Sequence, residues 1–215
     1  MSESPSPKPT FRELLRALRS RRLLVLLFLG FSSGLPYMLM LSSLKIWLRR
    51  EGIDLGTIGY FSWVAMIYNF NFLWAPLLDR FVPTRLGRRR SWMLFAQLGL
   101  IASIAALGIS DPQVSIGFIA AVATLVSLFS ATQDVAIDAY RRESLPDEEQ
   151  GIAASLVVYG YRVAILVATG FGLWVVDPET WGLSFQQMFV MIAGLMLVGV
   201  VTTLACREPE MEHPL

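Results

Sequence analysis

Two carboxylates, an amide and an arginine lie in stretches of this sequence that are otherwise strongly apolar. Asp134 and Asp138, with Gln133 beside the first, belong to "FSATQDVAIDAY" at 129–140. Arg162 lies in "VVYGYRVAI". In a soluble helix such residues form a solvated edge. Within a bilayer, ionisable side chains face a polar cavity or a partner, and they mark paths for protons and solutes.

The composition indicates that lipid is the solvent. Of the 215 residues, 54% are hydrophobic and 16% are charged, and the mean hydropathy is +0.54. A soluble domain has about 25% charged residues. The net charge of +1 gives no basic field for nucleic acid. The lone Cys206 and the lone His213 allow neither an internal disulfide nor a His-based metal cluster or catalytic triad. We therefore expect no enzyme and no cofactor.

Six apolar runs are long enough to span a bilayer, which takes about 20 residues. They cover 23–44, 57–78, 91–110, 114–137, 151–176 and 185–205. The Ser- and Pro-rich residues 1–9 are expected to be disordered. Residues 10–22 are predicted to form a basic amphipathic juxtamembrane helix, and 206–215 a cytoplasmic tail or the start of a linker. The fold class is thus an all-α membrane protein with six transmembrane helices.

Basic residues outside the spans predict the orientation, since Lys and Arg favour the cytoplasmic side. Three lie in segments expected outside: Lys45, Arg49 and Arg50. Fourteen lie in segments expected inside: Lys8, Arg12, Arg16, Arg19, Arg21, Arg22, Arg80, Arg85, Arg88, Arg89, Arg90, Arg141, Arg142 and Arg207. We expect both termini to be cytoplasmic.

Arg162 lies about eleven residues into the fifth run, or roughly 16 Å along a helix, which is the depth of the bilayer midplane. An arginine there costs at least about 2.5 kcal/mol, so it needs a polar cavity, a solute or an ion-pair partner such as Asp134. Asp134 lies one turn deeper than Asp138 and is a candidate proton or substrate site. Gln133 and Asp138 are candidates for the same site, although Asp138 precedes Arg142 by four residues, which favours an i,i+4 ion pair.

Further polar side chains in the spans are candidates for lining a cavity. Asn69 and Asn71 cannot share one helix face, so one could line a cavity while the other bonds a neighbouring helix, and Gln97 is a similar candidate. Tyr159 could stack on a sugar ring, although tyrosines in spans more often serve packing. Gly30 and Gly34 form a G-x-x-x-G pattern that favours close helix contact. Gly34 and Pro36 together predict a break or kink in the first span.

The segment "LLDRFVPTRLGRRRSW" at 77–92 is the most specific signal. Anchoring by positive charge accounts for Arg80 and for the three arginines at 88–90, but not for Asp79 or Gly87. The segment resembles the signature of the major facilitator superfamily between spans two and three, G-x-x-x-D-R-x-G-R-R. Ala75 replaces the first glycine, and five residues, 82–86, precede Gly87. This stretched form is similar to the muropeptide permeases of the AmpG type.

Further matches to that branch are "GFSSGLP" at 30–36, "IDLGTIGYFS" at 53–62, "FLWAPLLDR" at 72–80, "SATQDVAIDAY" at 130–140, "LPDEEQG" at 145–151 and "GYRVA" at 160–164. The resemblance implies proton symport of anhydromuropeptides across the bacterial inner membrane, or transport of siderophores or acyl-CoA compounds by related members. It also implies that the six spans are an N-terminal half whose partner half is a separate chain or a second copy. A truncated, non-transporting fragment or scaffold subunit is the alternative.

The resemblance suggests roles for the candidate residues. Arg162 would hold an anionic group of the cargo or pair with Asp134, and Asp134 would carry the proton. Asp79 would engage the second half, and with Arg80 and Arg88, Arg89 and Arg90 it would latch the cytoplasmic gate. The energy source would be the proton gradient.

Overall fold

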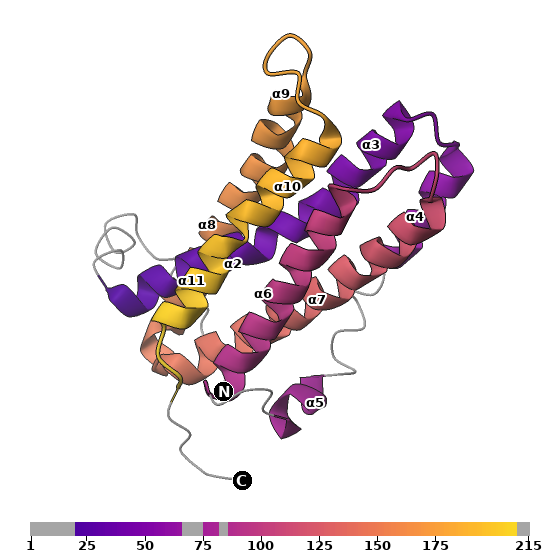
Figure 1. Cartoon of the computed structure of the whole chain (residues 1–215). Coiled ribbons are helices and arrows are strands. Elements are labelled where there is room, and N and C mark those ends of the chain that lie inside the picture. Colours follow the sequence, from indigo (N-terminus) through magenta and orange to yellow (C-terminus); the bar gives the residue numbers. More distant parts are fainter. Residues whose placement is uncertain (1–19, 66–74, 82–85, 210–215) are drawn as a thin grey trace, which may run out of the picture.

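The computed structural model describes residues 20–65, 75–81 and 86–209, and all regular elements in these ranges are helices. The elements are α2 (Arg21–Met38), η1 (Leu39–Ser43), α3 (Leu44–Arg50), α4 (Leu55–Ala65), α5 (Ala75–Arg80), α6 (Arg88–Leu107), α7 (Ile116–Ser144), η3 (Asp147–Glu149), α8 (Gln150–Ile165), η4 (Leu166–Phe171), α9 (Gly172–Val176), α10 (Phe185–Leu195) and α11 (Leu197–Ala205). Figure 1 shows them as a bundle of long, roughly aligned helices.

Five of the described helices are long and apolar enough to cross a membrane. They are Arg21–Arg50, Arg88–Leu107, Ile116–Ser144, Asp147–Val176 and Phe185–Ala205. Each corresponds to one of the six predicted spans. The remaining span, predicted at 57–78, is represented by α4 and α5, which flank residues outside the described ranges. Six spans therefore remain a prediction.

Helices extend beyond the apolar runs that predicted them. The first continues to Arg50 rather than residue 44, and the fourth continues to Ser144 rather than residue 137. The apolar run ends where charges begin, but the backbone hydrogen bonds of a helix continue through charged residues such as Lys45 and Arg141, which are good helix formers. Hydropathy thus located the spans but not their ends.

Pro36 does not end the first helix. It lies inside α2, and the π-helical turn η1 follows it. A second π-helical turn, η4, interrupts the fifth span. The Ser43 hydroxyl donates to the Ala168 carbonyl at 3.3 Å, so the two widened turns lie side by side. Such turns accommodate a local disruption of the helical ladder without breaking the helix.

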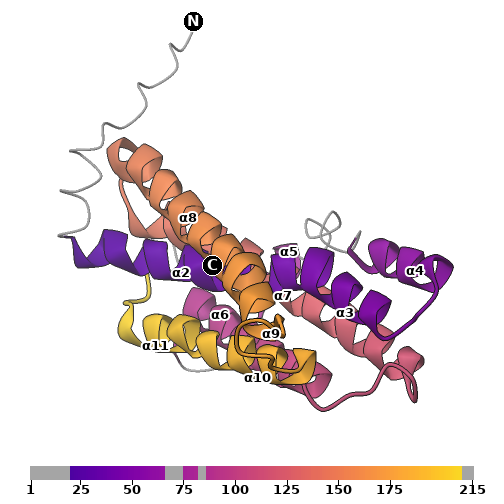
Figure 2. The same ribbon diagram turned by 90° about the horizontal axis from the view of Figure 1, so that it is seen from above.

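Close packing of α2 against α8 confirms the expectation from Gly30 and Gly34. A Cβ atom at Gly30 would collide with the backbone of Val157, and one at Gly34 would lie 2.6 Å from the Tyr161 carbonyl oxygen. From the other helix, a Cβ at Gly160 would collide with the Leu27 carbonyl. Backbones approach this closely only where side chains are absent. The crossing of α2 and α8 is clear in the view of Figure 2.

The first spanning helix begins on the side of the bundle where the last one ends. Arg21 donates from Nη2 to the Ala205 carbonyl at 3.2 Å, which joins the start of α2 to the end of α11. At the opposite end, the Arg50 guanidinium lies 5.4 Å from the centre of the Phe185 ring. This arrangement of the two ends is the one that six spans predict. Which side faces the cytoplasm stays a prediction.

Candidate functional site

Asp134 lies on α7 and is bonded to α2. Its Oδ1 accepts a hydrogen bond of 2.6 Å from the Ser33 hydroxyl, and the Asp134 residue is half-buried. The two residues are 101 positions apart in sequence. A short bond from a hydroxyl to a carboxylate is a charge-assisted interaction. It stabilises an acidic group within the membrane region of the bundle and links the first and fourth expected spans.

Gln133 belongs to a buried polar layer beside Asp134. Its Nε2 donates to the Ser32 hydroxyl at 3.1 Å, while the Thr203 hydroxyl donates to Gln97 Oε1 at 3.0 Å. All four of these side chains are buried. Gly199 makes room for the layer, because a Cβ there would lie 3.0 Å from Gln97 Nε2 and would collide with Ser32. Side-chain hydrogen bonds thus join α2 to α7 and α6 to α11, and the two pairs meet beside Gly199.

Arg162 lies on an exposed face of α8. Tyr159, three residues earlier and therefore on the same face, is 50% exposed, and Arg162 is exposed as well. In the described part of the chain, no ion pair joins Arg162 to Asp134, whose partner is Ser33. The guanidinium is thus available on a surface that the rest of the described bundle leaves uncovered.

Asp138 pairs with Arg141, not with Arg142 as predicted. The distance from Arg141 Nη2 to Asp138 Oδ1 is 3.3 Å, and the Asp138 side chain is 62% exposed. Arg141 also donates from Nη1 to Gln150 Oε1 at 2.9 Å, which turns its guanidinium toward Asp138. An exposed pair of this kind contributes little to stability.

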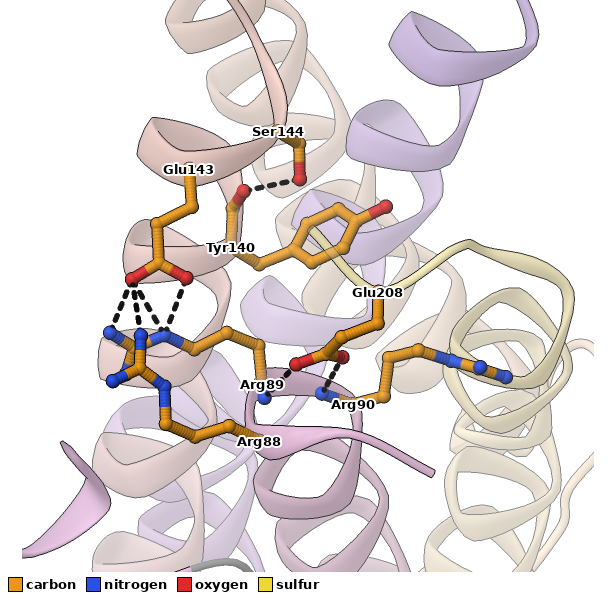
Figure 3. Close-up of polar contacts among 7 residues, drawn as sticks. All are labelled: Arg88, Arg89, Arg90, Tyr140, Glu143, Ser144 and Glu208. Carbon is orange, nitrogen blue, oxygen red and sulfur yellow. Dashed lines mark hydrogen bonds and ion pairs between the residues drawn. The ribbon is translucent and has the colours of Figure 1, made fainter. Parts of the chain in front are cut away.

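Glu143, at the end of α7, forms ion pairs with two arginines at the start of α6 (Figure 3). Arg89 approaches Glu143 most closely, with 2.5 Å from Nη2 to Oε1 and 3.0 Å from Nε to Oε2. Arg88 Nη2 lies 3.0 Å from the same Oε1. Arg89 is nearly buried. The bidentate geometry fits the planar guanidinium, so this cluster fixes α6 against α7.

Glu208, beyond α11, caps the start of α6 (Figure 3). Its Oε1 accepts from the Arg89 amide at 2.7 Å, and its Oε2 accepts from the Arg90 amide at 3.1 Å. Amides in the first turn of a helix have no partner inside that helix, and the helix dipole favours a carboxylate there. Gly87, with φ of 106°, provides the turn that brings them together.

Arg90 binds the end of α11 with its side chain. Its Nε donates to the Thr203 carbonyl at 3.0 Å, and its Nη2 donates to the Leu204 carbonyl at 2.9 Å. The last carbonyls of a helix lack partners within that helix. The arginines expected to latch a gate therefore have partners inside this chain, where they brace α6, α7 and α11 together.

The remaining predicted site residues are placed less fully. Asn69 and Asn71 lie outside the described residues. Asp79 belongs to α5, but its side chain lies outside the described part as well. Arg80 ends α5 and is exposed. Whether Asp79 and Arg80 act together with the α6 arginines stays a prediction.

Sequence reasoning missed Ser33, Glu143 and Glu208. Ser33 lies in the "GFSSGLP" stretch, but a serine in a span commonly bonds to its own helix backbone. Glu143 follows two arginines that seemed to anchor the helix end, and Glu208 lies in a short polar tail. A signal for the two glutamates existed: they are acidic residues within the basic segments expected on the cytoplasmic side.

Among the described residues, two titratable groups outside the spanning helices have shifted pKa values. The Thr57 hydroxyl, 2.5 Å from Asp54, lowers the pKa of that carboxyl, and the Thr57 amide adds to the effect. Burial raises the pKa of the Cys206 thiol. Asp54 stabilises the start of α4, and Cys206 is kept as a neutral thiol beside the Glu208 cap.

The helices and the basic cluster at one end of the bundle define a multi-pass helical membrane protein. A model of the family described as "Major Facilitator Superfamily" matches residues 26–215. This chain belongs to the major facilitator superfamily, whose members are transporters rather than enzymes and use no resident cofactor. As a member with bacterial relatives, it is placed in the bacterial inner membrane.

Curated relatives match most of the chain. The "Anhydromuropeptide permease" of Escherichia coli (strain K12) is 42% identical over 197 residues, which cover 92% of this chain and 40% of the relative. An "Uncharacterized protein" of Haemophilus influenzae is 39% identical over 90% of this chain and 45% of its own length. The "Putative transporter AmpG 4" of Rickettsia felis is 31% identical over 88% and 46%. The chain thus spans less than half the length of each of these relatives.

Proposed function

We propose that this chain forms one six-span half of a proton-coupled secondary transporter that imports anhydromuropeptides or a closely related small solute. The observation that carries the proposal is the 42% identity to the anhydromuropeptide permease over 92% of this chain. The other half would be a separate chain or a second copy. Rocking of the two halves against each other would give alternating access to a site between them.

In this proposal Asp134 carries the coupling proton. The ionised carboxylate accepts the bond from Ser33. A protonated Asp134 would gain an O–H donor and lose the charge that strengthens the bond from Ser33, so this bond would weaken. Proton binding thereby changes the contact between α2 and α7 and removes a charge from the membrane interior. Both changes favour movement of the half through a closed intermediate state.

Arg162 and Tyr159 form the proposed cargo surface on α8. A muropeptide carries carboxylates and a sugar ring. The Arg162 guanidinium can bind a carboxylate through two hydrogen bonds, and the exposed Tyr159 ring can stack on the apolar face of a sugar. The support for this assignment is the exposure of both side chains on the same face of α8.

The cluster of Arg88, Arg89 and Arg90 with Glu143 and Glu208 serves as a brace rather than as a contact between halves. It would keep the ends of α6, α7 and α11 together as a rigid unit during rocking. Asp79 and Arg80, on α5, would then be the residues that latch the partner half. This division of roles separates stability within the half from gating between the halves.

Uptake of a labelled anhydromuropeptide into proteoliposomes tests the proposal. One sample contains this chain with the part of the E. coli permease that follows the matched region, and a second contains this chain alone. Gradient-dependent accumulation is expected with the pair, and accumulation with the chain alone would indicate a homodimer. Folded protein that shows no uptake in either sample, while the whole E. coli permease is active beside it, would contradict the proposal.

A further inference from the structure

A cavity of about 530 Å³ opens at the end of the bundle where α2 begins and α11 ends. Its wall combines the first turn of α2, the last turn of α7 and the segment after α11. The charged side chains that line it are Arg21, Arg22, Arg207, Glu143 and Glu208. None of the roles assigned above to the cargo surface or the proton site involves this cavity.

The cavity wall carries an excess of available positive charge. Arg21, Arg22 and Arg207 are all exposed, and in the described part of the chain neither Arg22 nor Arg207 forms an ion pair. The two acids of the wall are already engaged. Glu143 binds Arg88 and Arg89, and Glu208 binds the amides at the start of α6, as Figure 3 shows. An anion can therefore enter without meeting an unpaired carboxylate.

We expect the cavity at the level of the lipid headgroups, because it lies at the ends of helices that are long and apolar enough to cross a membrane. Arg21 is the first residue of α2 and Ala205 the last of α11, so its arginines lie at the ends of two spanning helices. Guanidinium groups bind phosphate oxygens in a bidentate manner. Basic pockets between helices at a membrane face bind the headgroups of anionic lipids.

An exposed apolar stripe on α11 ends at Leu204, one residue before Ala205 of the cavity wall. Leu204, Val201 and Leu197 on α11 are 50%, 64% and 52% exposed. Their spacing of three and four residues places them on one helix face. A soluble phosphate compound would make no use of this stripe, but an acyl chain would lie along it while the headgroup occupies the cavity.

We propose that this cavity binds the phosphodiester headgroup of an anionic phospholipid, held by Arg21, Arg22 and Arg207, with an acyl chain along the α11 stripe. The site needs only that the start of α2 and the end of α11 lie at a membrane face. It is therefore independent of the cargo and of proton coupling. A bound lipid would add a fixed negative charge to the braced end of the bundle.

Native mass spectrometry of the full chain in a neutral detergent tests this proposal. The chain is titrated with phosphatidylglycerol, with phosphatidylcholine of the same acyl chains, and with soluble glycerol 3-phosphate. The test variant is Arg22→Gln/Arg207→Gln. The matched control is Arg141→Gln/Arg142→Gln, which removes the same charge at the same end of the bundle but outside the cavity wall. Arg207→Gln alone serves if the double variant does not fold.

Wild-type chain is expected to retain phosphatidylglycerol in preference to phosphatidylcholine. Each basic residue near an anionic headgroup contributes about a fivefold factor in affinity. The double variant should therefore bind phosphatidylglycerol on the order of thirtyfold more weakly, and Arg207→Gln alone about fivefold more weakly. The control should change less than about twofold.

Three results would overturn the proposal. The first is equal retention of the two lipids by wild-type chain. The second is unchanged phosphatidylglycerol affinity in the folded test variant. The third is displacement of the lipid by glycerol 3-phosphate at an equal concentration, which would assign the cavity to a soluble phosphate compound.

Discussion

Asp134, bonded to Ser33, is the residue proposed to bind and release the coupling proton. Asparagine has nearly the same shape as aspartate, and its side-chain oxygen still accepts from Ser33. Asp134→Asn should therefore fold normally but be unable to load or release a proton. We expect accumulation driven by a proton gradient to fall at least about tenfold, while exchange of cargo across the membrane without a gradient persists. On the paired halves, an uptake assay measures accumulation driven by the gradient, and a counterflow assay measures exchange without it.

Asp138→Asn is the matched control for Asp134→Asn. It removes an equal charge one turn away, where the carboxylate is exposed and paired with Arg141. Its gradient-driven uptake should stay close to that of wild type. Equal losses in the two variants would mean that the net charge of α7, and not proton loading at Asp134, explains the effect.

Arg162 should act on cargo affinity more than on turnover. A hydrogen bond to a charged group contributes about 1.5–3 kcal/mol, so Arg162→Gln should raise the KM for uptake by roughly 10- to 150-fold. Arg162→Lys keeps the charge but loses the bidentate geometry. Its KM should lie between that of wild type and that of Arg162→Gln. Uptake measured over a range of cargo concentrations gives the KM of each variant. A folded Arg162→Gln variant with unchanged KM would remove Arg162 from the cargo site.

At the scale of helices, the contact between α2 and α8 depends on the absence of side chains. A methyl group at Gly160 would collide with the Leu27 carbonyl, and the backbone has no free space to move. We expect Gly160→Ala to lower the free energy of unfolding by about 1–3 kcal/mol. Gly170→Ala, in the same predicted span, is the control because its added methyl meets open space. Unfolding in detergent, followed by circular dichroism, compares the two variants.

The brace at the end of the bundle should matter for the docking of α6 on α7. Glu143→Gln removes the charge that Arg88 and Arg89 share. Since the Glu143 side chain is 31% exposed, solvent screens part of the loss, and we expect about 1–3 kcal/mol of destabilisation. Glu148→Gln, on the exposed η3 turn, should be close to neutral. Equal stability of Glu143→Gln and wild type would show that the cluster is not a brace.

Much of the helical framework follows from the sequence, because apolar runs of this length have few alternatives to crossing a bilayer. Five of the six predicted spans correspond to described helices, and the contact at Gly30 and Gly34 follows from residue size. The hydrogen-bond partners of the polar residues could not be predicted from the sequence. Asp134 bonds to Ser33 rather than Arg162, since the rotation of α8 about its axis decides which way Arg162 points. That rotation is set by backbone packing at Gly160, which sequence spacing alone does not reveal.

At the scale of the whole molecule, the exposed faces of α8 and α11 differ in chemistry. The face of α8 carries Arg162 and Tyr159 beside apolar side chains such as Val163, which is 50% exposed. The stripe on α11 is apolar throughout, with Val201 at 64% exposed. A guanidinium is costly against lipid tails, whereas an apolar stripe is not. The α8 face is therefore expected to meet a water-filled path between two halves, and the α11 face to meet lipid.

Cysteine labelling distinguishes these two environments. With Cys206 replaced by serine, Val163→Cys and Val201→Cys each place one thiol at a similarly exposed position of the described bundle. A hydrophilic maleimide reacts with thiolate in water and hardly enters hydrocarbon. In membranes that contain both halves, we expect rapid labelling at position 163, slowed by excess cargo, and at least about tenfold slower labelling at position 201. Comparable rates at the two positions, or a rate at 163 that cargo does not change, would mean that the α8 face does not line the transport path.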